Sequence, residues 1–177
     1  MTIDEFREWV ATIASKGQVS GCTDEEVALL MLAQGVERLP DDYRAFLKVA
    51  GRRAGGFGKG IEMFYPLLLQ TKEWMKEALE ADGAPFSLPP SAFVFYSSQG
   101  YNFWYFEDAE SDPPIVANWA ERHRPRRLFR TFGEWLEAET DRDEQIRHNI
   151  EASSRGEAVN WTAASYDSYR TIDDDVV

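Results

Sequence analysis

The chain contains few of the residues from which metal and redox centres are built. Its 177 residues include one cysteine, Cys22, and two histidines, His123 and His148. A single cysteine excludes an intramolecular disulfide, a paired-cysteine redox motif and a cysteine-rich zinc site. Neither histidine has a neighbour at metal-ligand spacing, so we expect no metal centre. We interpret Cys22 as a small packed residue in a protein of a reducing compartment.

Long apolar runs and catalytic motifs are also missing. No segment approaches the roughly 18 apolar residues that a membrane helix needs, and the acidic start from Met1 to Glu5 is unlike a secretory signal. We therefore expect a cytoplasmic protein. There is no Gly-x-Ser-x-Gly motif, and in the glycine-rich segment Lys59 is followed by Gly60 instead of the hydroxyl residue of a phosphate-binding loop. We predict neither an enzyme nor a cofactor-binding protein.

Acidic and aromatic residues are abundant. The chain has 31 acidic and 19 basic residues, a net charge of −12, and 14% of its residues are aromatic. The aromatic content is typical of a packed core. A negative field repels nucleic acid and attracts basic proteins, although acidity also serves solubility alone. The one basic segment, from Arg122 to Arg130, we interpret as a loop that neutralises nearby acids.

The spacing of apolar residues predicts a mixed fold. Helical spacing, capping residues and glycine stops indicate helices over about 3–16, 23–35, 40–51, 71–81 and 131–150. Aromatic and β-branched segments predict strands over 61–65, 93–96, 101–106 and 115–119. Strands and helices do not alternate regularly. We therefore expect an α+β fold, with a mainly antiparallel sheet and helices packed to one side.

The length fits one domain. We assign residues 1–152 to it. Beyond residue 153 apolar residues are sparse and the chain ends on acids, so residues 153–177 are predicted to form a flexible acidic tail.

Several short motifs together resemble the SUKH superfamily. The run from Leu39 to Leu47, LPDDYRAFL, is similar to its hallmark: a leucine-proline start, an acid, an aromatic and a short helix, followed here by the glycines of 55–56. Later segments agree in order with its mid-chain helix, core strand, glycine-then-aromatic strand and closing helix: 71–74, 92–96, 100–107 and 132–136. Each motif is weak alone, but together they span about residues 23–140.

The resemblance implies a non-catalytic, cofactor-free immunity protein with a single SUKH-like domain. Such a protein binds and neutralises a cognate bacterial toxin domain. These toxins are often nucleases, whose surfaces are basic, so an acidic inhibitor can compete for the same surface. Fungal members of the superfamily are interaction modules, and the alternative is therefore a scaffold or regulatory domain with a non-toxin partner. We expect a monomer or weak homodimer that contacts neither nucleic acid nor membrane.

Six residues are candidate partner contacts, chosen by charge and expected exposure. Alternation along 101–106 places Phe103 and Tyr105 on one face of the sheet, and Trp104 and Phe106 on the other. A sheet covered on one side would expose part of one set, whereas helices on both faces would bury both. The paired acids at 41–42 also suit a helix N-terminus. The candidates are Asp41, Asp42, Tyr101, Trp104, Glu107 and Asp108.

Overall fold

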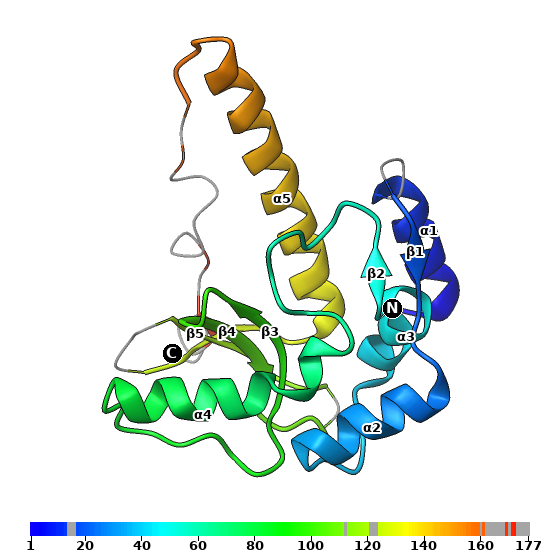
Figure 1. The fold of residues 1–177 in the computed structure, drawn as a ribbon, viewed down its shortest axis with the longest axis vertical. Coiled ribbons are helices and arrows are strands. Elements are labelled where there is room, and N and C mark those ends of the chain that lie inside the picture. The colour runs from blue at the N-terminus through cyan, green and yellow to red at the C-terminus, as the bar shows by residue number, and fades with distance from the viewer. Residues whose placement is uncertain are drawn as a thin grey trace.

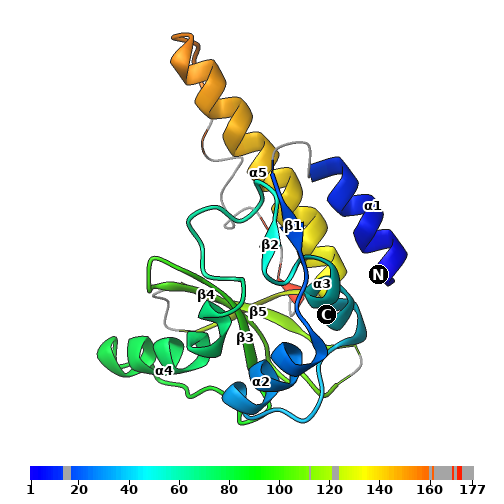
Figure 2. The same cartoon turned by 45° about the vertical axis from the view of Figure 1, so that its right-hand side comes forward.

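The computed structural model describes residues 1–13, 17–111, 113–120, 124–159, 161, 169, 171 and 172. Its helices are α1 (Ile3–Ile13), α2 (Asp24–Gln34), α3 (Asp41–Ala50), the 3-10 turn η2 (Leu67–Leu69), α4 (Thr71–Ala81) and α5 (Phe132–Ser154). Its strands are β1 (Val19–Ser20), β2 (Arg53–Ala54), β3 (Phe93–Ser98), β4 (Asn102–Phe106), β5 (Val116–Ala120) and β6 (Arg126–Phe129). In Figures 1 and 2 α5 projects well beyond the rest of the molecule.

The centre of the fold is a four-stranded sheet. Its strands follow one another in the order β3-β4-β5-β6, and every neighbouring pair is antiparallel. The two-residue strands β1 and β2 form a separate antiparallel pair. The α+β fold with an antiparallel sheet predicted from the sequence is therefore confirmed.

Helices cover the sheet on both faces. One face, with Trp104 and Phe106 of β4, packs into the large core beneath α3 and α5. The other face, with Phe103 and Tyr105, packs against α4. The predicted alternation along β4 is confirmed, but α4 departs from the expected placement of the helices on one side (Figure 1). With both faces covered, all four aromatic residues belong to the core.

Tyr43 of α3 lies at the middle of the large core. Its ring centroid is 4.8 Å from that of Phe132 and 5.3 Å from that of Phe106, both in edge-on geometry. The aromatic residue of the LPDDY motif is thus a core residue that joins α3 to the sheet and to α5. Aromatic pairs in this geometry contribute beyond the apolar area they bury.

The helices begin and end where the sequence indicates. Thr23 and Glu26 form a complete capping box at the start of α2, and Gly35 ends that helix at a positive φ of 66°. Thr131 caps α5 by accepting a hydrogen bond from the Glu134 backbone N–H. Helix α1 is described to residue 13, and the rest of the predicted helix lies outside the described residues.

Two strand predictions need correction. Residues 61–65 do not form a strand: Glu62 makes one isolated bridge to Ser97 of β3. Conversely, Arg126–Phe129 of the basic segment is strand β6 instead of a loop. Arg122 and His123 lie outside the described residues.

Most of the predicted tail lies outside the described residues, and its flexibility stays a prediction. Helix α5 extends to Ser154, close to the predicted boundary. Within the segment, the ring of Tyr169 packs edge-on against Phe129 at 5.4 Å, and its hydroxyl donates to the Ala138 carbonyl of α5.

The buried side-chain amide of Gln34 hydrogen-bonds to the edge strand β3. Gln34, the last residue of α2, donates through Nε2 to the carbonyl oxygens of Val94 and Leu68, both at 2.9 Å. Its Oε1 accepts the Val94 N–H at 2.7 Å, so the side chain pairs with the strand as a neighbouring strand would. Thr71 of α4 adds a 2.7 Å bond to the Val94 carbonyl. Side chains thereby satisfy backbone groups that an edge strand leaves unpaired.

Candidate partner-binding surface

Carboxylates gather at one end of the four-stranded sheet. Glu110, in the loop that follows β4, lies against the connection from α2 to α3, where the Glu37 N–H donates to its carboxylate at 2.8 Å. Asp41 and Asp42 line a hollow of about 240 Å³ together with Pro113 and Pro114 of that loop. We call this surface the acidic end and define it as Glu37, Asp41, Asp42, Asp108 and Glu110. All but Asp42 are exposed.

The two neighbouring aspartates at the start of α3 have different roles. Asp41 is exposed, and its carboxylate lies 3.8 Å from the Arg38 guanidinium, an open pair on the surface. Asp42 is half-buried and accepts hydrogen bonds from the backbone N–H groups of Tyr43, at 2.7 Å, and Gly133, at 3.0 Å. Because Gly133 lies in the first turn of α5, Asp42 stabilises that helix start. Asp41 is thus the one whose charge is available to a partner.

Glu107 and Asp108, which follow β4, also differ. Glu107 is half-buried, and both its oxygens accept from Arg127 Nε of β6 at 2.9 Å, so its charge is neutralised within the sheet. This pair agrees with the prediction that the basic segment neutralises nearby acids. Asp108 is exposed, and its carboxylate accepts the backbone N–H of Glu110 at 3.1 Å. Its carboxylate therefore contributes to the negative field of the acidic end.

The two aromatic candidates do not lie at the acidic end. Trp104 is fully buried beneath α5, where its ring lies 6.1 Å from that of Trp135. This burial corrects the expectation that Trp104 is exposed, because the choice assumed a sheet with one open face. Tyr101 is 42% exposed, but it precedes β4 whereas Glu107 follows it, so the two lie at opposite ends of the strand.

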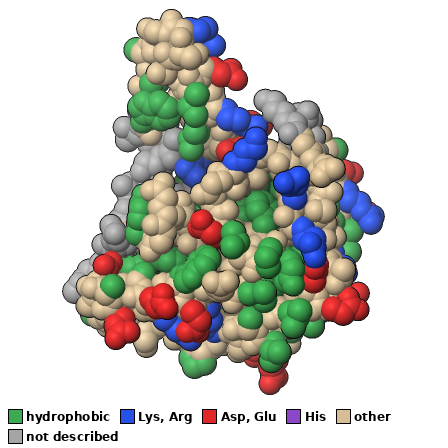
Figure 3. All heavy atoms as spheres, in the orientation of Figure 1, with side chains coloured by type: hydrophobic (Ala, Val, Ile, Leu, Met, Phe, Trp, Pro, Cys, Tyr) green, Lys and Arg blue, Asp and Glu red, His purple; other side chains and the backbone are tan. Residues whose placement is uncertain are grey.

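An apolar surface on α2 was not expected. The outer side of the helix exposes Leu32 by 78% and Leu29 by 47%, and the adjacent η2 exposes Leu67 by 45%. Figure 3 shows apolar side chains gathered over α2 and η2. We call Ala28, Leu29, Leu32, Ala33 and Leu67 the apolar α2 face. The signal was present in the sequence, since residues 27–33 are seven consecutive apolar residues and exceed one helical stripe.

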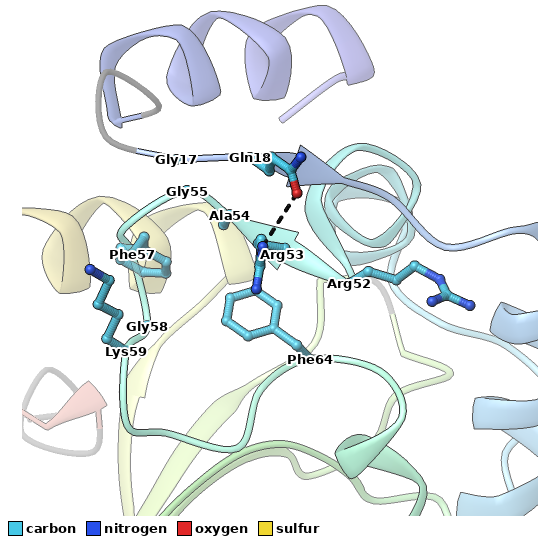
Figure 4. A pocket seen from close by; sticks show the side chains of 10 residues that line it. All are labelled: Gly17, Gln18, Arg52, Arg53, Ala54, Gly55, Phe57, Gly58, Lys59 and Phe64. Carbon is cyan, nitrogen blue, oxygen red and sulfur yellow. Dashed lines mark hydrogen bonds between the residues drawn. The ribbon is translucent and has the colours of Figure 1, made fainter.

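A second hollow, of about 360 Å³, lies beside the glycine-rich loop (Figure 4). Its lining contains Arg52, Arg53 and Lys59 and no carboxylate. Arg52 turns away from it to pair with Glu26 of α2. The remaining cations suit an anion, which is the opposite of the charge that the acidic end suits.

The loop beside this hollow needs glycine for a steric reason. Gly58 has a φ of 68°, and a Cβ at this position would lie 2.9 Å from the Phe64 ring. The loop therefore packs closely on that ring, as expected of a structural turn.

Cys22 is packed and unreactive by its environment. It is nearly fully buried, and this burial raises the pKa of its thiol to about 11, against the smaller opposing effect of the Arg52 and Lys48 charges. The thiolate form is therefore scarce at neutral pH. This supports the interpretation of Cys22 as a small packed residue.

The described part of the chain lacks two features, a metal-binding cluster and a membrane-spanning helix. No three His, Cys, Asp or Glu side chains in this part of the chain are grouped so that they could hold a metal ion. None of the helices described here combines the length and apolarity needed to cross a membrane.

The model of the SMI1/KNR4 family (SUKH-1) matches residues 21–138, about two thirds of the chain. The matched range contains α2, α3, α4, the whole four-stranded sheet and the first turns of α5. It nearly coincides with the span over which the sequence motifs agree in order. No curated protein matches the chain.

Proposed function

The chain belongs to the SMI1/KNR4 family (SUKH-1), which includes immunity proteins, and from this premise we propose that it is a non-catalytic immunity protein. It binds a cognate bacterial toxin domain with a basic surface, such as a nuclease, and neutralises it by occupying that surface. The toxin meets the acidic end, and the candidate contacts are Asp41 and Asp108, with Glu107 beside them.

The observation that supports this proposal most directly is the exposure of the acidic end. Four of its five carboxylates face solvent on a chain of net charge −12. Several like charges on one surface raise the local concentration of a cationic partner and increase its association rate. The internal roles of Asp42 and Glu107 leave Asp41 and Asp108 as the residues to test.

The test uses the toxin domain encoded by the neighbouring reading frame. Wild-type protein co-expressed with the toxin is expected to protect cells. In vitro, inhibition of the toxin is expected to be complete at one molar equivalent of the protein. The double variant Asp41→Lys/Asp108→Lys is expected to bind more slowly and at least about tenfold more weakly, with a reduced salt dependence. Tyr101→Ala tests whether the interface reaches the far end of β4.

A matched control reverses two charges elsewhere. Glu77 and Glu80 are exposed on α4, and Glu77→Lys/Glu80→Lys changes the net charge by the same amount. Equal losses in the two double variants would mean that only net charge matters and would contradict the acidic end as the site. A wild-type protein that binds a partner but never protects cells would favour the alternative, a scaffold or regulatory interaction domain.

A further inference from the structure

The apolar α2 face is larger than the packing of α2 requires. The helix already buries Val27, Leu30 and Gln34 on its inner side. Leu29 and Leu32, with Leu67 of η2 beside them, contact solvent instead. Isolated exposed leucines are common, but a contiguous group on one helix and its neighbour is typical of an interaction site.

From this surface we infer that the apolar α2 face is the centre of the partner interface whose charged rim is the acidic end, and that it receives an apolar projection of a basic protein surface. The inference rests on the proposed function, because it names the second half of the same site.

Continuity along the chain connects the two surfaces. Leu32 lies in the last turn of α2 and Glu37 follows five residues later, a separation of at most about 18 Å even for an extended chain. The Glu37 N–H bond to Glu110 then joins this segment directly to the loop that follows β4. One partner can therefore cover the leucines and the carboxylates together.

Charge decides what kind of partner fits. At the N-terminal end of α2, Glu25 is exposed one turn before Leu29, while Asp24 and Glu26 are paired with Lys48 and Arg52. At the C-terminal end the chain enters the acidic end. An apolar centre with exposed carboxylates at both ends matches a partner that carries leucine-like side chains among lysines and arginines.

A second copy of the chain fits this surface less well. Each copy carries a charge of −12, so pairing two acidic rims costs electrostatic energy. Three leucines also offer less than the roughly 800 Å² per partner of a standard interface, so the contact must extend beyond them. Extension over the acidic end favours a basic partner and opposes a like-charged one.

The experiment measures binding of the neighbouring-frame toxin domain to four variants of the full chain. Leu29→Ala/Leu32→Ala is expected to weaken binding about tenfold or more, because apolar area is no longer buried. The matched control, Ile3→Ala/Ile150→Ala, removes two exposed apolar side chains on other helices and is expected to leave affinity unchanged. Circular dichroism verifies that each variant is folded.

Two single variants test the sign of the partner's charge. Leu32→Lys is expected to weaken binding more than Leu32→Glu, because a basic partner repels the lysine and partly accommodates the glutamate. Equal losses of affinity in the two variants, or a larger loss in Leu32→Glu, would contradict a basic partner. Unchanged binding by the double alanine variant, with Asp41→Lys/Asp108→Lys still impaired, would overturn the apolar centre and leave the proposed function intact.

Sedimentation and the wild-type arm distinguish the remaining outcomes. If Leu32→Lys converts a wild-type dimer to a monomer without affecting toxin binding, the occupant is a second copy and the inference is wrong. If wild-type protein neither binds the toxin nor protects cells, it is the proposed function that fails.

Discussion

Helices α2 and α4 have the same length, eleven residues each, and both pack on η2 and bury one side, yet their outer sides are opposites. α4 exposes charged residues, among them Glu73, Lys76 and Glu77. α2 exposes Leu29 and Leu32. The apolar residues of α4 are those its packing uses, as in an ordinary surface helix, whereas α2 has more than its packing uses. The difference is what we expect if α2, and not α4, makes the proposed contact with a partner.

The largest expected effect is a difference in stability between substitutions on the buried and the exposed sides of α2. Leu30 is fully buried, so Leu30→Ala is expected to lower the free energy of unfolding by about 3 kcal/mol through lost burial and a cavity. Leu32→Ala is expected to change it by less than about 0.5 kcal/mol, because the side chain contacts mostly solvent. Urea denaturation of both variants provides the measurement. A loss at position 32 comparable to that at position 30 would mean that Leu32 serves the fold, and the comparison would fail.

The next effect concerns the polar end of the inner side of α2. Gln34→Leu removes the acceptor of the Val94 N–H and one of the two donors to the Leu68 carbonyl, the other being the Thr71 hydroxyl. We expect a loss of about 2 kcal/mol in the free energy of unfolding. Gln70→Leu, at an exposed glutamine, is the control and is expected to be nearly neutral. Equal losses would show that the amide bonds contribute nothing specific.

A smaller effect concerns the contact that Lys72 makes between α4 and α2. Lys72 of α4 is buried and donates to the Gln34 carbonyl of α2 and the Pro90 carbonyl. Burial lowers the pKa of Lys72 from its ordinary value of 10.5, against a weaker opposite effect of Glu73. Between the lowered and the ordinary pKa the unfolded chain binds more protons than the folded chain, so stability increases as pH rises through that interval.

The Lys72→Met variant isolates this contribution. The difference in unfolding free energy between wild type and variant is expected to move in favour of wild type as the pH rises toward the ordinary lysine pKa of 10.5. A difference that stays constant or moves the other way would mean that the ammonium is not disfavoured in the fold.

The smallest expected effect comes from a substitution that makes the outer side of α4 resemble that of α2. Glu77→Leu places a leucine on the charged outer side of α4, and we expect a change in stability within about 0.5 kcal/mol. Toxin affinity is expected to stay unchanged, because the added leucine lies outside the interface. Tighter binding by this variant would show that any exposed leucine suffices, and the contrast between the helices would lose its meaning.

The local signals in the sequence predicted most of the fold. The capping residues Thr23 and Thr131 act within one helical turn, so the starts of α2 and α5 could be found without knowing what they pack on. Alternation along β4 likewise depends only on strand geometry, and the two faces were assigned correctly. The motif around Tyr43 indicated the family because its residues are close in sequence.

The errors concern contacts between residues distant in sequence. Strand β6 has a basic, loop-like composition and forms because it pairs with β5, with Arg127 bonded to Glu107 twenty residues away. The burial of Trp104 depends on α5 covering its face of the sheet, which periodicity within one strand does not reveal. Gln34 meets Val94 sixty residues later, and nothing in its own neighbourhood marks it as a core residue. The acidic end was partly predicted, since Asp41 and Asp108 were candidates, but its continuity with α2 was not.

The two edge strands of the sheet are protected in different ways. The Gln34 amide hydrogen-bonds to β3, and β6 is only four residues long and carries two arginines. Short, charged or capped margins do not template the addition of a strand from another molecule. We therefore expect the sheet not to extend by edge-to-edge pairing between copies, and the proposed interface accordingly uses side chains on helices and loops.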